Sequence, residues 1–262
     1  MDKNQKLHIS SQVYDAIAQD SSGSYPFATG VYHAPFIKPI IRQLWKANHQ
    51  PIHLTEIGPN TTPIVQFLDG LQAHVDYVGL EASSVAVAYA EQQFAHMPNI
   101  KILNIPIASD DVHQEAIATQ AIQNAQVVYA SYVGPSIGLL NVITYIAERL
   151  QQGGQLLVID RVYQAGQEFH LAALGYVHFI LHLILYCLVH RVRFPLGNLL
   201  WQLTQSTIYG NKHYRSAQQL WRSNATGNRK QVREQILTVG RTHGIHFDIT
   251  FTGDVIILVG KK

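Results

Sequence analysis

LTEIGPNTT, residues 54–62, joins the end of a predicted strand to the start of a predicted helix. The run Pro51–Ile57 is typical of a buried strand, and Gly58 permits a tight turn and the close approach of a ligand to the backbone. Thr62 is a suitable N-cap, and Pro63 suits the first position of a helix. A helix that begins here would direct free backbone N–H groups at an electronegative ligand.

A second strand predicted at Val75–Leu80 leads into Glu81, which lies 23 residues after Gly58. In nucleotide-binding α/β proteins an acid at about this distance accepts hydrogen bonds from ribose hydroxyls. The spaced glycines that admit a pyrophosphate are missing from the segment after Gly58, so a dinucleotide is disfavoured.

The rest of the chain continues this alternation of short strands and helices, which predicts an α/β fold with a mostly parallel sheet. Helices are expected at Val85–Ala95 after a cap at Ser83 or Ser84, at Leu139–Leu150 before Gly153-Gly154, and at Lys230–Thr242 before Gly244. Further strands are expected at Ile100–Ile105, Ala125–Ser131 and Gln155–Asp160, and a final hairpin at His246–Phe251 and Asp254–Val259.

Four segments of one domain follow from this pattern. Residues 1–49 are predicted to form a helical lid, with helices at Gln12–Ala18 and Phe36–Asn48 and a link rich in Gly, Ser and Tyr at Ser21–Tyr32. Residues 50–160 form the cofactor-binding core, 161–229 a helical cap inserted after the fifth strand, and 230–262 the last helix and hairpin.

Five stretches resemble the class I S-adenosylmethionine-dependent methyltransferases. They are LTEIGPNTTPIVQFL (54–68), YVGLEASSVAVAYAEQQF (77–94), VVYASYVGPSI (127–137), AERLQQGGQLLVIDR (147–161) and FTGDVIILVGKK (251–262). The resemblance covers about Pro51–Asp160 and, more loosely, Lys230–Gly260. It implies a Rossmann-like fold with a seven-stranded, mostly parallel sheet, helices on both faces and an antiparallel last strand.

The same resemblance implies S-adenosyl-L-methionine as cofactor and supplies roles for individual residues. Glu56 and Gly58, with Pro59 and Asn60, would lie by the methionine moiety. Glu81 would bind the ribose beside Ala82, Asp110 or Asp111 would lie near the adenine, and Ser131 would end the strand that faces the substrate. The family usually has two further glycines after Gly58, where this chain has Asn60 and Thr62; Asn tolerates a left-handed backbone, so the turn is expected to persist.

Methyl transfer needs a general base only when the nucleophile enters protonated. The candidates are Tyr32 and His33 in the predicted lid, Tyr132 after the fourth strand, and His178 or His182 in the cap. The spacing of His178 and His182 suits two metal ligands on one helix face, but no carboxylate joins that face, and no metal is predicted.

Charged residues make up only 14% of the chain, against about 25% in an average domain. Phe169–His190 contains none over 22 positions, so the cap is expected to enclose a small, largely apolar or aromatic substrate. A single membrane span there would separate the last two strands from their sheet, which favours a buried helix. Shallow contact with an anionic membrane stays open, because Arg191 and Arg193 follow directly.

The net charge of +2 combines −6 over residues 1–160, 0 over 161–190 and +8 over 191–262. Aromatic residues lie among the basic ones near the C-terminus, so an RNA-modifying methyltransferase remains an alternative function, although binding of nucleic acid is disfavoured. Aminobutyrate transfer from the same cofactor, as in nicotianamine-type synthases, is a second alternative, and a non-catalytic subunit a third. Cys187 is the only cysteine, which excludes a disulfide within the chain and favours a cytoplasmic location; a membrane-peripheral position stays open.

Overall fold

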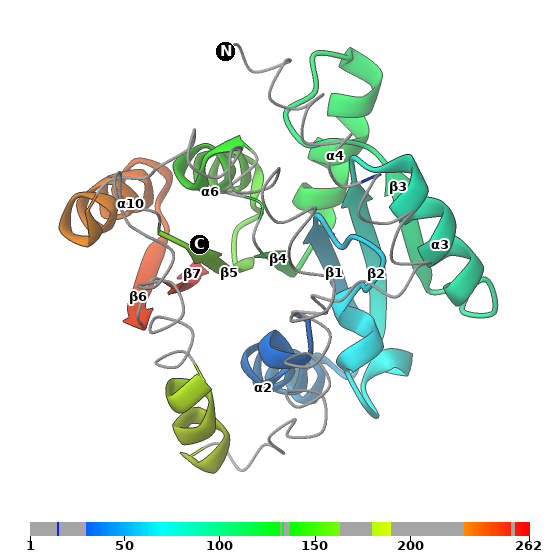
Figure 1. Cartoon of the computed structure of the whole chain (residues 1–262), viewed down its shortest axis with the longest axis horizontal. Helices are drawn as coiled ribbons and strands as arrows, with labels where there is room; N and C mark the ends of the chain where they lie inside the picture. The colour runs from blue at the N-terminus through cyan, green and yellow to red at the C-terminus, as the bar shows by residue number, and fades with distance from the viewer. Residues whose placement is uncertain are drawn as a thin grey trace.

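A computed structural model describes residues 15, 30–131, 133, 137–162, 180–189, 228–252 and 255–262. Seven strands form one sheet in the order β3-β2-β1-β4-β5-β7-β6 (Figure 1). They are β1 (Ile52–Ile57), β2 (Val75–Glu81), β3 (Ile100–Asn104), β4 (Val127–Ser131), β5 (Gln155–Arg161), β6 (His246–Thr252) and β7 (Val255–Lys261). The pairs among β1 to β5 are parallel, and β7 is antiparallel to both β5 and β6. The predicted mostly parallel sheet with an antiparallel last strand is confirmed.

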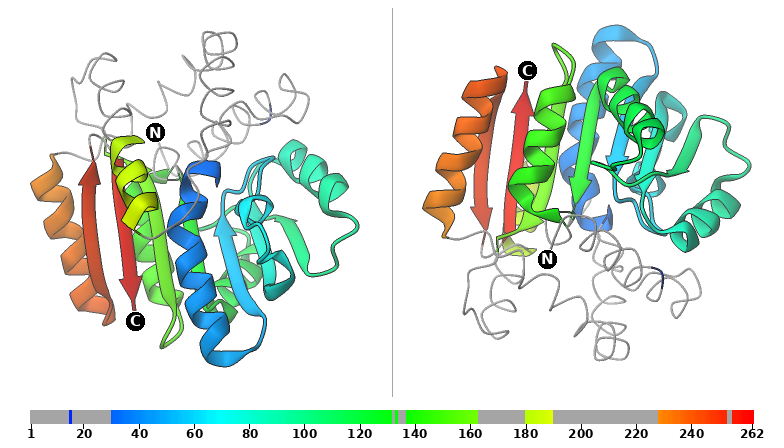
Figure 2. Two further views of the ribbon diagram at one scale, coloured as in Figure 1. Left: turned by 90° about the horizontal axis from the view of Figure 1, so that it is seen from below. Right: turned by 90° about the horizontal axis from the view of Figure 1, so that it is seen from above.

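Helices cover both faces of this sheet (Figure 2). One face, here called the α2 face, carries α2 (Gly30–Asn48), the 3₁₀ helices η1 (Ile64–Phe67) and η2 (Gln72–His74), α3 (Ser84–Phe94) and a helical segment at residues 180–189. The opposite face, the α6 face, carries α4 (Val112–Asn124), α6 (Leu139–Arg149) and α10 (Arg229–His243).

Alternate side chains of each central strand enter the two layers, because successive residues of a strand point to opposite faces. On β4, Val127 and Tyr129 pack in the α2 face, whereas Val128 and Ala130 pack in the α6 face. All four are almost completely buried. Strands buried on both faces read as continuous apolar runs, and Val127–Ala130 is such a run.

The chain after β1 differs from the prediction of a helix capped by Thr62. It forms only the four-residue η1, whose N-cap position is Pro63 without a side-chain cap. The reason is the short distance to Gly70, which has a left-handed φ of 71° and turns the chain. A full helix does not fit between Pro63 and this turn, since an α-helix needs several turns to become stable.

The N-terminal helix also differs, because α2 begins at Gly30 and not at Phe36, and it continues through Pro35 and Pro39. Proline inside a helix costs a backbone hydrogen bond. Burial of Tyr32, Ala34 and Ile37 against the sheet offsets this cost. Residues 30–32 of the predicted link are therefore helical, and the predicted helix Gln12–Ala18 lies outside the described residues except for Asp15.

The remaining boundaries lie within a few residues of those expected. Ser83 caps α3 by accepting a hydrogen bond from the Ala86 N–H, and Gly244 ends α10 in a left-handed conformation. The helix α4 was not predicted; Asp111 caps it. Among the described residues, no helix is long and apolar enough to cross a membrane.

Candidate functional site

The site lies where the strand order reverses, between β1 and its neighbours β2 and β4. In open α/β sheets, ligands bind outside the carboxyl ends of the strands at such a reversal. Gly58 leaves β1 with a φ of 70°, and its N–H donates to the Leu80 carbonyl at 2.9 Å. A Cβ at Gly58 would lie 3.0 Å from Val133 Cγ2. This turn therefore lies against both neighbouring strand ends, with room for backbone but not for a side chain.

Glu81 joins two loops at this edge of the sheet. Its Oε2 accepts from the Asn60 N–H at 2.8 Å, and its Oε1 accepts from the Ser83 N–H at 2.8 Å. Asn60 has a φ of 53°, so the residue in place of the family's second glycine does adopt the left-handed conformation that was expected. The Ser83 hydroxyl donates to Asp15 Oδ1 at 2.5 Å.

The carboxyl group of Glu81 is buried, and this burial raises its pKa; the backbone N–H donors act in the opposite direction. A carboxylate has about four lone-pair positions on its two oxygens. The bonds from Asn60 and Ser83 occupy one position on each oxygen. The Ala82 N–H is a third backbone donor to this carboxyl group, so acceptor capacity for about one further hydroxyl group remains.

Glu56 makes a second buried contact, on the α2 face of β1. Its Oε2 accepts from the Ile64 N–H at 2.7 Å and from the Tyr77 hydroxyl at 2.5 Å. Burial raises the pKa of Glu56 to about 8, and these two hydrogen bonds partly oppose that shift. Glu56 thus fixes the first residue of η1 to β2, and it is mainly protonated at neutral pH.

Gly79 makes the contact between Tyr77 and Glu56 possible. Gly79 is paired with Glu56 across β1 and β2. A Cβ at Gly79 would lie 2.9 Å from Pro59 Cγ and 3.1 Å from the Tyr77 hydroxyl. The missing side chain therefore leaves the space in which Tyr77 and the buried Pro59 meet Glu56.

His33 and Tyr32, two of the candidate bases, are buried in the first turns of α2. His33 Nδ1 and the Tyr129 hydroxyl form a hydrogen bond of 2.5 Å. Burial lowers the pKa of His33 to about 3, so its ring is neutral at neutral pH. The structure therefore places both residues in the layer between α2 and the sheet.

Tyr132 and His178, two further candidate bases, lie outside the described residues. His182 is described, and its ring stacks on Phe36 with 6.2 Å between centroids. Burial lowers its pKa. His182 therefore packs against α2.

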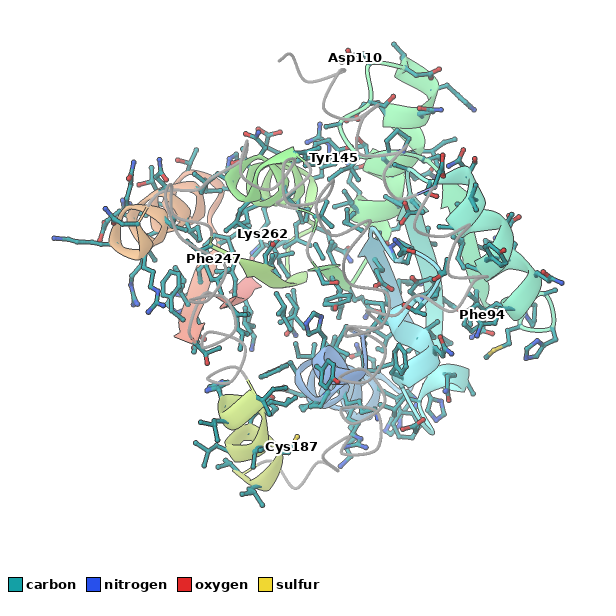
Figure 3. All side chains as sticks on the ribbon, in the orientation of Figure 1. Phe94, Asp110, Tyr145, Cys187, Phe247 and Lys262 are labelled. Carbon is teal, nitrogen blue, oxygen red and sulfur yellow. The ribbon has the colours of Figure 1, made fainter. Side chains whose placement is uncertain are left out.

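The two candidate adenine contacts follow β3. Asp111 is exposed and accepts from the His113 and Gln114 N–H groups at the start of α4, at 2.9 and 3.0 Å. Asp110 is exposed beside it, at the outer end of α4 (Figure 3). Ala82 is fixed to β3 by Asn104, whose amide donates to the Glu81 and Ala82 carbonyls at 3.1 Å each. Ser131, half-buried, ends β4 next to the Gly58 turn.

One feature of the turn indicates a missing polar partner. Thr61 is 1% exposed, and among the described residues its hydroxyl has no hydrogen-bond partner. A buried hydroxyl without a partner carries a free-energy cost. The unsatisfied hydroxyl, the bare Gly58 backbone and the spare acceptor capacity of Glu81 together fit a bound nucleoside. No group of His, Cys, Asp and Glu that could hold a metal ion occurs in the described part of the chain.

Sequence reasoning missed several residues of this arrangement, namely Thr61, Tyr77, Ser83 as a partner of Glu81, Asn104 and Tyr129. Tyr77 and Tyr129 had a detectable signal, because each is a polar aromatic residue in a largely apolar predicted strand. Their partners are 21 and 96 residues away in sequence, and spacing alone does not identify such pairs.

No family model and no curated protein matches this chain. Solved structures do. The carbon methyltransferase of CurJ aligns with a TM-score of 0.51 at 13% identity, over 87% of this chain and 53% of that one. The CMeT domain of the citrinin polyketide synthase aligns with a TM-score of 0.51 at 16% identity, over 86% and 50%. This chain thus spans about half the length of those two.

The plantazolicin methyltransferase BpumL, solved in complex with SAH, aligns along nearly its whole length. The TM-score is 0.58 at 8% identity, over 98% of this chain and 95% of that one. With the strand order described above, these similarities define the class: the chain has the Rossmann-like fold of the S-adenosylmethionine-dependent methyltransferases.

Proposed function

We propose that this protein is an S-adenosylmethionine-dependent methyltransferase that acts on a small, largely apolar or aromatic molecule. The observation that carries the proposal is the position of Glu81. It ends β2 beside the reversal of strand order, and backbone N–H groups from two loops orient its carboxylate. Neighbours of the same fold have been solved with SAH, the product of methyl transfer.

In this proposal the residues of the two loops hold the cofactor. Glu81 accepts a hydrogen bond from a ribose hydroxyl, and Gly58 and Asn60 let the backbone approach the methionine moiety. The Thr61 hydroxyl finds its missing partner on the ligand. Asp110 and Asp111 lie on the adenine side, and Ser131 with the residues after it faces the substrate.

The cofactor supplies an electrophilic sulfonium methyl group. The lone pair of the substrate attacks the methyl carbon, the carbon–sulfur bond breaks with its electron pair passing to sulfur, and a protonated nucleophile loses a proton. Alignment and exclusion of water then provide much of the rate. The candidates for accepting the proton are Tyr32, His33, Tyr132 and His178; burial lowers the pKa of His33 to about 3, which makes its neutral ring a weak proton acceptor.

The apolar substrate class rests on the uncharged run Phe169–His190. Its described part, residues 180–189, places Leu183 and Cys187 in the core of the α2 face. The labelled Cys187 in Figure 3 lies on this segment, on the side of the sheet that α2 covers. Ile180 and Tyr186 pack against the same core.

Calorimetric titration with S-adenosylhomocysteine tests cofactor binding. We expect binding by the natural chain and a loss of about tenfold or more in Glu81→Gln, because hydrogen bonds to a charged group contribute about 1.5–3 kcal/mol. The matched control is Glu91→Gln, which changes an exposed acid of α3 and should bind normally. No binding by the natural chain, or equal binding by both variants, would contradict the proposal.

Incubation with S-adenosylmethionine and a panel of small aromatic and apolar molecules tests the reaction. Methyl transfer yields S-adenosylhomocysteine, whereas aminobutyrate transfer yields methylthioadenosine. If methylthioadenosine is the product, the reaction is aminobutyrate transfer and the proposed methyl transfer is wrong. Turnover of RNA but of no small molecule would replace the proposed substrate.

A further inference from the structure

The segment 180–189 carries an apolar surface that stays exposed among the residues the structure describes. The described part of the chain has five large hydrophobic side chains that are strongly exposed, and four of them are in this segment. They are Leu181, Leu185, Leu188 and Val189, which are 53, 62, 71 and 76% exposed. The fifth, Val112, lies on α4 on the other face of the sheet.

These side chains form one stripe. Leu181, Leu185 and Leu188 are four and three residues apart, so they lie on the same side of a helix. Leu183 and Cys187 lie on the other side and are buried. The segment is therefore anchored to the core along one side, and its leucine stripe faces outward.

The neighbouring helix α2 carries exposed positive charge. The two helices are in contact, since Tyr186 packs on Phe36 with 4.4 Å between ring centroids, and Figure 2 shows them side by side on the sheet. Arg42 and Lys46 of α2 are exposed, and α2 contains no acidic residue. Lys38 of α2 is paired with the exposed Asp69 at 3.1 Å, so the basic character of this pair of helices rests on Arg42 and Lys46, and its exposed leucines are those of residues 180–189.

We propose that this surface, formed by residues 180–189 and the outer side of α2, binds the interface of an anionic lipid bilayer. Interfacial helices combine an apolar side that enters the acyl boundary with basic residues that meet anionic headgroups. A ten-residue helix is about 15 Å long, which suits a position in the plane of the interface. The sequence continues the same charge pattern with Arg191 and Arg193.

Two features favour a lipid surface over a protein partner. The exposed apolar residues are aliphatic, whereas protein interfaces are usually anchored by Trp, Tyr and Arg in pockets. In a two-fold dimer through this surface, the same patch of each copy would meet, which would gather two copies of Arg42 and of Lys46 into one interface without an acidic residue of α2 to pair with them. The inference does not depend on the proposed methyl transfer.

Flotation of the full chain with lipid vesicles tests this inference. We expect binding to phosphatidylcholine vesicles that contain about one-third phosphatidylglycerol, weaker binding without the anionic lipid, and release by salt. Leu185→Glu should weaken vesicle binding at least about tenfold, because it removes an apolar side chain that would be buried in the bilayer interface. Arg42→Glu should weaken it by about fivefold or more.

The matched control is Val112→Glu, which places the same charge on an exposed apolar position of the opposite face. It should leave vesicle binding unchanged, and circular dichroism should show that all variants are folded. Absence of binding by the natural chain, or an equal loss in Val112→Glu and Leu185→Glu, would overturn the inference. So would a dimer in solution that Leu185→Glu dissociates without any effect on vesicles.

Discussion

The two faces of the sheet differ in what they bury. The α2 face encloses His33, Glu56, Tyr77 and Tyr129 among its apolar side chains. The α6 face is filled mainly by apolar residues of α6, β4 and β5, and its ionic cluster of Glu115 and Arg149 is partly exposed. It also buries Thr55, whose hydroxyl donates to the Ala121 carbonyl of α4, and Asp160. Buried polar groups are stabilising only when each is satisfied, so the α2 face depends on more buried polar contacts than the α6 face does.

Removing a core side chain of the α6 face should have the largest effect. Ile143 of α6 is completely buried, and Ile143→Ala should lower the free energy of unfolding by about 2–5 kcal/mol. Urea denaturation measures this loss. Val112→Ala, at an exposed position, is the control and should change stability little. If Ile143→Ala lost less stability than the polar variants of the α2 face described next, the α6 face would not be the more stabilising of the two.

The pH dependence of stability should come from the α2 face. The pKa of Glu56 is raised to about 8, so the folded protein keeps a proton there that the unfolded chain releases. Stability from Glu56 is therefore lost as pH rises toward 8, and the raised pKa of Glu81 acts in the same direction. His33, with its pKa lowered to about 3 from 6.5, adds stability with rising pH only below about 6.5.

Between pH 6.5 and 8 the contribution of His33 no longer changes, so the effect of Glu56 can be measured without it. Over this range we expect the free energy of unfolding to fall by up to about 2 kcal/mol. Denaturation across this range in the natural chain and in Glu56→Gln measures it. The Gln variant keeps an acceptor oxygen but cannot ionise, so most of the slope should disappear. A slope that persists unchanged would assign the pH dependence to other groups.

Two tyrosine variants compare a hydrogen bond to a buried carboxyl group with one to a partly exposed carboxyl group. Tyr77→Phe removes a donor to the buried Glu56 and should cost about 1–2 kcal/mol. Tyr145→Phe on the α6 face removes a donor to Glu115, whose side chain is 27% exposed and also bound by Arg149. Water and Arg149 can replace that contact, so the second loss should be smaller when both are measured by thermal unfolding.

The smallest effect on stability is expected for Thr61→Val. The hydroxyl has no partner among the described residues, so its removal should leave the unfolding free energy equal or raise it by up to about 1 kcal/mol. Binding of S-adenosylhomocysteine should nevertheless weaken by about tenfold, as calorimetry can measure. Loss of stability together with unchanged binding would show that the hydroxyl serves the fold and not the ligand.

Much of the fold was predictable because its signals are local. Apolar runs, the Ser83 cap and the breaks at Gly153 and Gly244 are read within a few residues. The predictions failed where distant contacts override local preference: the burial of Tyr32 and Ala34 carries α2 through two prolines. The turn at Gly70 shortens η1, so the segment after Gly58 is not the long helix that its first residues suggest.

For the site, the sequence by itself determined which residues lie at the strand ends: Glu56 at the end of β1 with Gly58 directly after the strand, and Glu81 at the end of β2. Strand ends follow from side-chain periodicity, which is a property of neighbouring residues. Only the tertiary structure decided what these residues do. Two carboxyl groups in similar positions became a core contact of Tyr77 and a clamp between two loops, because their partners come from separate strands and loops that meet only in the folded sheet.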